Sequence, residues 1–298
     1  MNSIELTSVN KFFGEHHAVS DMSFEVPEGA VYGFLGPNGA GKTSTIRMIM
    51  SILYPDSGTL KVLGDDQPER VKDRLGYLPE EKGLYKKMKV KEIITYFGTL
   101  KGMSRRDAAA EADKLLVRFG LEDAASKRCE EMSKGMGQKV QIISTLIHDP
   151  ALVILDEPFS GLDPINVELV RDIILDLKHD GKTVIFSTHI MEQAEQICDS
   201  ILLINKGVKL LDGKVAEVKG QFSSTLLVDY DGDPANLNRP GIVRVNNMGN
   251  SAELSVEEGA DTQALLRELM DAVKLNSFTL KEPSLHEIFV RTVGESDT

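Results

Sequence analysis

The stretch from Gly36 to Thr43, which reads Gly-Pro-Asn-Gly-Ala-Gly-Lys-Thr, constrains the fold more than any other part of the chain. The apolar run at 31–35 that precedes it is typical of a buried strand. After it, the apolar residues Ile46, Ile49 and Leu53 recur at helical spacing. A G-x-x-x-x-G-K-[ST] sequence between a strand and a helix predicts a phosphate-binding loop.

The residue types in this loop explain how it would bind an anion. Glycines at 36, 39 and 41 leave room for successive backbone N–H groups to surround a phosphate. The helix expected to begin at Lys42 adds unpaired N–H groups and the positive end of its dipole. Lys42 is expected to reach the β- and γ-phosphates, and the Thr43 hydroxyl to bind Mg²⁺. We therefore predict a nucleoside triphosphate site formed by Gly36, Pro37, Asn38, Gly39, Ala40, Gly41, Lys42, Thr43 and Ser44.

Two acidic residues suited to catalysis follow the apolar run Leu152-Val153-Ile154-Leu155. Four consecutive large apolar residues are typical of a central parallel strand that is buried on both faces. Asp156 and Glu157 end this strand, where ligand sites form in such sheets. Asp156 suits Mg²⁺, and Glu157 suits the base that activates a water. The alternative is a strand that ends in a solvated acidic turn; the nearby phosphate loop favours the metal and base roles.

Two further residues have open alternatives on local grounds. Phe13 lies upstream of the phosphate loop and could stack on a nucleotide base or belong to the core. His189 follows the apolar segment 183–187, so we expect it at the same edge of the sheet as Glu157. A contact from His189 to the γ-phosphate is favoured over a structural role.

Length and composition set the broad class of protein. The 298 residues allow one large domain and one small domain. The formal net charge of −12 argues against binding to a nucleic-acid backbone. No run approaches the roughly 18 apolar residues that a membrane span needs. The first five residues lack the features of a secretion signal. We therefore expect a cytosolic chain whose membrane role, if it has one, comes through a partner.

The pattern of elements predicts two domains, at 1–219 and 221–298. Residues 88–148 read as an all-helical insert, in which Ser104 and Asp107 are spaced as a capping box. After residue 221 the predicted order is β-α-β-β-α-β, a ferredoxin-like sequence of elements. A zinc-protease motif at His286-Glu287 fails because Val290 stands where the second histidine is required.

Taken together, these motifs resemble the nucleotide-binding subunit of an ATP-binding cassette (ABC) transporter over roughly residues 1–215. Met132-Ser133-Lys134-Gly135-Met136 is similar to the family's L-S-G-G-Q signature loop and keeps Ser133 and Gly135. The D-loop corresponds to 160–163 and ends at Asp163. The resemblance implies that the nucleotide is ATP, that Phe13 stacks on adenine, and that His189 is the switch histidine. Glu80 stands where the family has a glutamine that approaches Mg²⁺, and a carboxylate cannot donate a hydrogen bond as an amide does.

The resemblance also carries expectations about fold, assembly and activity. It implies an α/β P-loop cassette with a mixed sheet core, an antiparallel β lobe and the helical insert. Residues 221–298 resemble a small α+β domain found on some bacterial export ATPases, including sodium-extrusion types. The implied activity is ATP hydrolysis in a head-to-tail homodimer. This dimer powers a separate membrane permease at the cytoplasmic face of the cell membrane, and the C-terminal domain favours export.

The residues leave two alternatives to transport. One is a soluble ABC-type ATPase that acts on ribosomes or nucleic acid. Such relatives carry two cassettes, a long coiled coil or a zinc site, whereas this chain has one phosphate loop and a short insert. The other is a regulatory module that holds ATP without turnover, which Glu157 and His189 disfavour.

Overall fold

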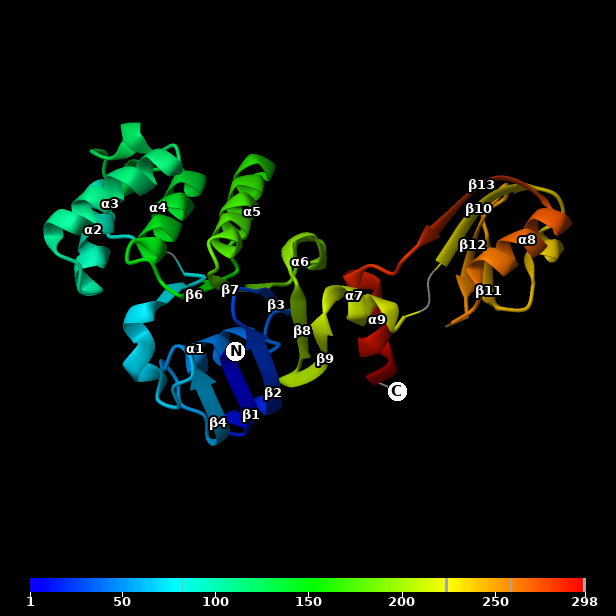
Figure 1. The fold of residues 1–298 in the computed structure, drawn as a ribbon, viewed down its shortest axis with the longest axis horizontal. Coiled ribbons are helices and arrows are strands. Elements are labelled where there is room, and N and C mark those ends of the chain that lie inside the picture. The colour runs from blue at the N-terminus through cyan, green and yellow to red at the C-terminus, as the bar shows by residue number, and fades with distance from the viewer. Residues whose placement is uncertain (82, 223–224, 258, 297–298) are drawn as a thin grey trace. The chain divides into compact units, whose positions relative to one another are not determined.

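The structure is a computed structural model that describes residues 1–81, 83–222, 225–257 and 259–296. Its elements form two compact units, Met1–Asp212 and Gly213–Thr298 (Figure 1). The predicted domain boundary at 219–221 follows helix α7 (Val215–Gly220), near the start of the second unit. Residues 297 and 298 of the predicted C-terminal domain lie outside the described residues.

A six-stranded sheet forms the centre of the first unit, in the order β5-β6-β7-β3-β8-β9. Strands β5, β6, β7, β3 and β8 pair in parallel. Only two residues join β8 to β9, so this last pair is a hairpin and the sheet is mixed. Because parallel strands end at the same edge, the residues that follow β3, β6 and β7 come together there. The strands span Val31–Leu35 (β3), Leu75–Leu78 (β5), Leu152–Asp156 (β6), Thr183–Thr188 (β7), Ser200–Asn205 (β8) and Val208–Lys214 (β9).

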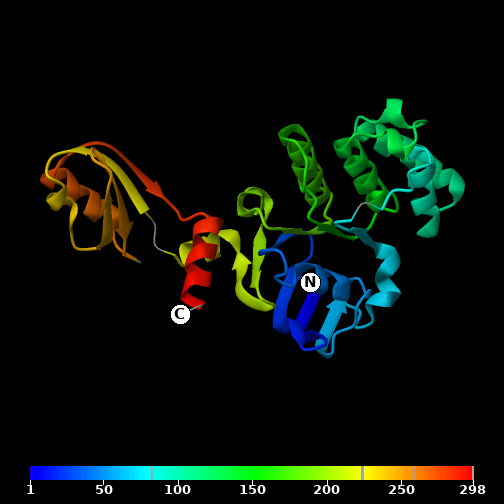
Figure 2. The ribbon, with the colours of Figure 1, turned by 180° about the vertical axis from the view of Figure 1, so that it is seen from behind.

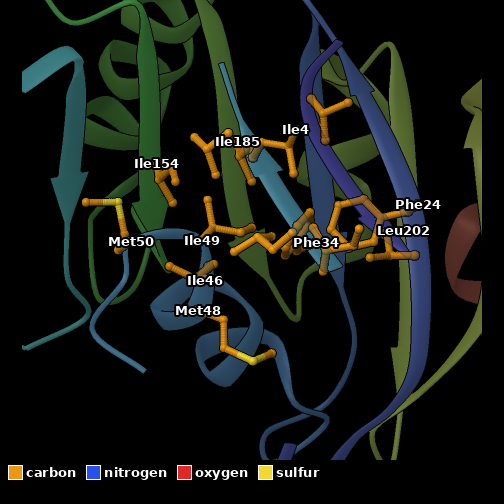
Figure 3. Packing of buried hydrophobic residues seen from close by; sticks show 14 of the residues in the cluster. Ile4, Phe24, Phe34, Ile46, Met48, Ile49, Met50, Ile154, Ile185 and Leu202 are labelled. Atoms are coloured by element: carbon orange, nitrogen blue, oxygen red, sulfur yellow. The ribbon is translucent and has the colours of Figure 1, made fainter. Parts of the chain in front are cut away.

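A three-stranded antiparallel sheet, in the order β2-β1-β4, provides the β lobe. Its strands are β1 (Asn2–Phe13), β2 (His16–Pro27) and β4 (Ser57–Val62). Apolar side chains from this sheet, the central sheet and helix α1 (Lys42–Ile49) form one buried cluster, shown in Figure 3. Phe24 of β2 packs edge-on against Phe34 of β3, with ring centroids 5.3 Å apart. This core fixes the strand and the helix on either side of the phosphate loop.

The helical insert contains α2 (Val90–Leu100), α3 (Arg105–Arg118) and α4 (Lys134–Leu146), coloured cyan to green in Figures 1 and 2. Ser104 caps α3 by accepting a hydrogen bond from the Asp107 N–H at 3.1 Å, as the capping-box spacing predicts. Helix α5 (Pro164–His179) packs against β7, and helix α6 (Met191–Ile197) packs against β3 and β7. Short 3₁₀ segments lie at Pro68–Arg74, Glu122–Ala124 and Cys129–Glu131. The predicted mixed core, antiparallel lobe and helical insert are confirmed.

The second unit is built on a four-stranded antiparallel sheet, in the order β11-β12-β10-β13. Helix α8 (Thr262–Ala272) packs its apolar residues Leu265 and Leu269 into the core of this unit. The first predicted helix is a four-residue 3₁₀ turn, Pro234–Leu237. A final helix, α9 (Leu285–Ser296), was not predicted. The strands span Thr225–Asp231 (β10), Ile242–Asn247 (β11), Ser251–Val256 (β12) and Lys274–Lys281 (β13).

Candidate active site

The phosphate loop joins the end of β3 to the start of α1. Gly36 and Gly41 have φ values of 155° and 104°. A Cβ on Gly36 would overlap the Ile204 carbonyl oxygen, and a Cβ on Gly41 would lie 2.6 Å from the Ala18 carbonyl oxygen. Only glycine fits at these two positions. The Lys42 ammonium donates to the carbonyl oxygens of Gly36 at 2.7 Å and Pro37 at 3.2 Å, so the lysine curls back over its own loop.

The end of β6 places Asp156 beside the first turn of α1. Asp156 is almost completely buried and lies opposite Ser187 of β7 in the parallel register. The Ser187 hydroxyl donates to Oδ1 of Asp156 at 2.5 Å, and the Thr43 hydroxyl donates to the same atom at 3.5 Å. The other oxygen, Oδ2, is buried and has no hydrogen-bond partner within the described part of the chain. Burying a hydrogen-bond acceptor without a partner costs free energy unless a ligand supplies the missing contact.

These oxygens fit the requirements of Mg²⁺. Mg²⁺ prefers one or two protein oxygen ligands and completes its shell with water and substrate phosphates. Thr43 and the unpartnered carboxylate oxygen of Asp156 supply such ligands next to the phosphate loop. Across the ranges that the structure describes, no three or more His, Cys, Asp or Glu side chains group as a metal cage. The donor set therefore suits an ion that arrives with a phosphate substrate.

Glu157 lies between Lys42 of the phosphate loop and His189, the residue that follows β7. Its Oε1 atom is 3.5 Å from Nζ of Lys42, and its Oε2 atom is 3.1 Å from Nδ1 of His189. The carboxylate is 8% exposed, whereas the histidine is 46% exposed. Its backbone has a φ of 49°, in the left-handed region, and its N–H donates to the Ser187 hydroxyl at 2.9 Å. Such backbone strain persists where surrounding contacts hold it, and it concentrates at functional sites.

A cleft of about 430 Å³ opens over the phosphate loop. Phe13, Glu80 and Glu157 line it together with the loop. The Phe13 ring is 47% exposed, so it does not belong to the core. His16 and Ala18 also line the cleft and were not predicted. They lie on β2, which pairs with the strand that carries Phe13, and this pairing could have indicated their place at the site. Residues 38–44 of the loop line the cleft, while Gly36 and Pro37 contribute the carbonyls that hold Lys42.

Tyr77 of β5 lies near the acidic end of the site. Burial and the nearby Asp156 carboxylate raise the pKa of Tyr77 to about 12. The phenol therefore stays protonated at neutral pH. It adds no negative charge close to where Mg²⁺ and phosphates would bind.

The predicted residues Ser133, Gly135 and Asp163 lie neither on the cleft nor beside Glu157. Ser133 is exposed and caps α4, because its hydroxyl accepts a hydrogen bond from the Met136 N–H at 3.3 Å. Asp163 caps α5, and hydrogen bonds from Asn166 hold the pKa of its carboxyl below the usual range. Gly135 lies against the side chain of Asn166. The signature-like loop therefore lies against the first turn of α5, and neither it nor the segment 160–163 lines the cleft within the described chain.

Comparison with known proteins agrees with this geometry. The family model "ABC transporter" matches residues 19–160. ABC transporter ATP-binding protein YhaQ of Bacillus subtilis is 38% identical over 293 residues, covering 98% of each chain. This chain belongs to the ABC transporter ATP-binding proteins.

Further comparisons extend the likeness to the whole chain. The model "ATP-binding protein DrrA1-3-like, C-terminal domain" matches residues 213–293 of this ABC protein. Nod factor export ATP-binding protein I of Burkholderia lata is 32% identical over 295 residues, covering 98% of this chain and 97% of its own. ABC transporter ATP-binding protein NatA of B. subtilis is 44% identical over 200 residues, which cover 66% of this chain and 81% of NatA. A solved structure described as an ATP-binding subunit of an ABC transporter superimposes with a TM-score of 0.68 at 27% identity, covering 90% of this chain and 99% of its own.

Membership confirms the predicted P-loop cassette fold and the ATPase activity, since ABC cassettes bind and hydrolyse ATP to power transport. ABC ATP-binding subunits dimerise and work with membrane permeases. Among the described residues, no helix is both long and apolar enough to cross a bilayer.

Proposed function

We propose that this ABC protein is the ATP-hydrolysing subunit of an exporter and that Glu157 is the general base. The position of Glu157 carries the proposal, because its carboxylate lines the cleft and contacts both Lys42 and His189. A carboxylate there can accept a proton from the water that attacks the γ-phosphate. Lys42 stabilises the charge of the phosphates, and His189 orients Glu157 while its exposed edge faces the nucleotide.

Mg²⁺ would be held by Thr43 and Asp156, with Glu80 as a further oxygen at the cleft wall. When bound, the ion neutralises phosphate charge and orients the γ-phosphate. Ser187 supports this role, since it holds one Asp156 oxygen and leaves the other available. Phe13 offers its exposed ring to adenine, and the backbone N–H groups of the loop surround the phosphates.

We propose that a second copy of the chain completes the site in a head-to-tail dimer. The cleft lacks the signature loop, whose exposed Ser133 and helix start form a second anion-binding end. Next to the D-loop, Ile165 is 82% exposed, an unusual position for a large apolar side chain. A dimer that apposes Ser133 of one subunit to Lys42 of the other would bury such a residue. It would also make two equivalent sites.

A separate cleft supports the coupling to a permease. It has a volume of about 470 Å³ and lies between the edge strand β5 and the helical insert. Tyr85 and Leu100 line it and are each more than half exposed. An exposed apolar cleft on a subunit that works with membrane partners suits an apolar segment of the permease. This placement would put the chain at the cytoplasmic face of the membrane, held there through its partner.

Export is the direction that we propose. The name of one relative supports it, since that relative is a Nod factor export ATP-binding protein. The match of residues 213–293 to a DrrA-like C-terminal domain supports it as well. The alternative, a soluble ATPase that acts on ribosomes or nucleic acid, is opposed by the net charge of −12.

The test of this function is the assembly state of Glu157→Gln with nucleotide. Without the base, ATP should stay bound and hold two subunits together, because the contacts that close the dimer persist. Size-exclusion chromatography with Mg-ATP should therefore give a dimer, and ADP should give a monomer. The double variant Lys42→Ala/Glu157→Gln is the control and should stay monomeric. A Glu157→Gln protein that binds Mg-ATP and stays monomeric would contradict the shared site.

A further inference from the structure

The side chain of Asn166 occupies the space that a side chain at Gly135 would need. A Cβ built on Gly135 would lie 2.6 Å from Nδ2, 3.0 Å from Cγ and 3.3 Å from Oδ1 of Asn166. All three nearest atoms thus belong to one amide group. Real Cβ atoms do not approach other heavy atoms this closely, so the amide and any larger residue at 135 exclude each other.

The amide of Asn166 is not able to move aside easily. Its Nδ2 donates to Oδ2 of Asp163 at 2.7 Å, and its backbone N–H donates to Oδ1 of the same carboxylate at 2.9 Å. Asp163 is both the N-cap of α5 and the last residue of the D-loop. The two bonds fix the Asn166 rotamer relative to the D-loop. The amide that Gly135 meets is therefore held by the Asp163 carboxylate.

A second contact runs in the opposite direction between the same two loops. The end of the Lys134 side chain lies over Gly161 of the D-loop, where a Cβ would overlap its Nζ atom. Each loop thus has a glycine at the point where a side chain of the other loop lies. Figures 1 and 2 both show the two helices that begin at these loops, α4 and α5, next to each other. Asn166 and Lys134 together join the first turns of these helices.

We propose that Asn166 is a positioning residue, which sets where the signature loop (132–136) lies relative to the D-loop (160–163) of the same subunit. The inference rests on the proposed function, in which Ser133 faces the γ-phosphate held by the partner. A displacement of the D-loop then moves the signature loop of the same subunit with it. The D-loop of one subunit thus sets the position of that subunit's signature loop. The signature loop is the anion-binding end that faces the ATP held by the other subunit.

The test is a cycle of substitutions at the contact. Gly135→Ala should push the first turn of α4 away from α5 and lower kcat by about 10²-fold, because misplacement by about 1 Å has this effect on catalysis. The KM for ATP should change little, since the phosphate loop is untouched. Adding Asn166→Ala removes all three clashing atoms, so the double variant should recover the kcat of Asn166→Ala alone.

A matched control lies two residues along the same helix. A Cβ at Gly137 would meet only Leu84 Cδ1, at 4.0 Å. Gly137→Ala should therefore leave kcat unchanged. If the double variant is as slow as Gly135→Ala, the glycine is needed for another reason and the proposal is overturned.

A further variant keeps the test decisive if Gly135→Ala does not fold. Asn166→Asp has the same shape, but its carboxylate is repelled by Asp163 and cannot donate to it. It should lower kcat without raising the KM for ATP, and an unchanged kcat would also overturn the proposal. The proposed function fails on a different measurement, namely a Glu157→Gln protein that forms no dimer with Mg-ATP. The recovery of kcat in the double variant Gly135→Ala/Asn166→Ala does not depend on the dimer assay, so the two proposals can fail separately.

Discussion

Nζ of Lys42 lies 3.5 Å from Oε1 of Glu157, and the two side chains are only 6% and 8% exposed. The Glu157 oxygen has no hydrogen-bond partner within the described chain, while the lysine donates to two carbonyls of its own loop. The cation proposed to bind phosphate and the carboxylate proposed as the base therefore form an ion pair. A triphosphate that enters competes with Glu157 for this ammonium.

Replacing the base should separate binding from hydrolysis. Glu157→Gln keeps the shape of the side chain but cannot accept the proton of the attacking water. We expect the rate of phosphate release to fall by about 10²- to 10⁴-fold. Affinity for Mg-ATP should be retained, because the amide no longer repels the γ-phosphate. Glu28→Gln, on the exposed turn between β2 and β3, is the control and should hydrolyse at the wild-type rate. Wild-type turnover by Glu157→Gln would exclude Glu157 as the base.

The buried ion pair should also be visible in stability. Lys42→Ala leaves the Glu157 carboxylate buried without its cation, which is expected to lower the free energy of unfolding by about 3 kcal/mol. The double variant Lys42→Ala/Glu157→Gln removes both charges and should regain most of this loss. Urea unfolding without nucleotide measures the cycle. If the two single changes simply add, the pair does not interact in the folded state.

Phe13 should contribute to nucleotide affinity through stacking alone. Phe13→Ala is expected to weaken Mg-ATP binding by about 1–3 kcal/mol, and Phe13→Trp to preserve it. Phe12→Ala is the matched control: Phe12 is equally exposed but stacks on His17, with ring centroids 4.0 Å apart. Isothermal titration calorimetry in the Glu157→Gln background gives the affinities. An equal loss for both alanine variants would remove Phe13 from the base site.

Stability should fall in mild acid through His148. Burial holds the pKa of His148 below its ordinary value of 6.5, and the Lys101 ammonium acts in the same direction. Its Nε2 lies 3.0 Å from the Leu75 carbonyl oxygen, while Nδ1 is buried without a partner among the described residues. A proton on Nδ1 would therefore have no acceptor in the folded protein. As the pH falls, the unfolded chain binds a proton at His148 at a higher pH than the folded protein does.

The sign follows from this difference. As the pH falls below 6.5, the unfolded state gains a proton that the folded state does not, so the free energy of unfolding decreases. Below the folded pKa the decrease stops. His148→Gln should show a smaller decrease between about pH 7.5 and 5.5, whereas His179→Gln, exposed at the end of α5, should behave as the wild type. Equal acid sensitivity in both variants would contradict the role of His148.

The parts of the site that the sequence predicts are those with local causes. The phosphate loop needs glycines between a strand and a helix, and Asp156 and Glu157 follow a continuous apolar run. Ser187 was missed although it holds both acids, because its role depends on the register between β6 and β7. Asn166 was missed for a similar reason, since its contact is with Gly135 of a different helix.

The final helix could have been predicted from a local signal. Ser284 and Glu287 form a reciprocal cap, in which the Ser284 N–H donates to Glu287 Oε2 at 2.8 Å and the Glu287 N–H donates to Ser284 Oγ at 3.2 Å. The S-x-x-E spacing is visible in the sequence. By contrast, the extent of β13 has no local signal, because its exposed polar residues are held in the strand by pairing with β10. That pairing is a tertiary effect, which local patterns do not contain.

The most direct test of the account mixes two inactive variants. Ser133→Arg should block the approach of the signature loop while leaving nucleotide binding intact. Lys42→Ala should lose the phosphate contact but keep a normal signature loop. Each variant alone should hydrolyse little ATP. In a heterodimer, the Lys42 site of one subunit meets the Ser133 of the other, which assembles one complete site.

The measurement is the ATPase rate of the equimolar mixture, with heterodimers counted by pull-down of a tag on one variant. The account predicts that activity appears on mixing and rises with the fraction of heterodimer, from the one intact site that each pair contains. No recovery despite proven heterodimers, or normal hydrolysis by Ser133→Arg alone, would contradict the shared site.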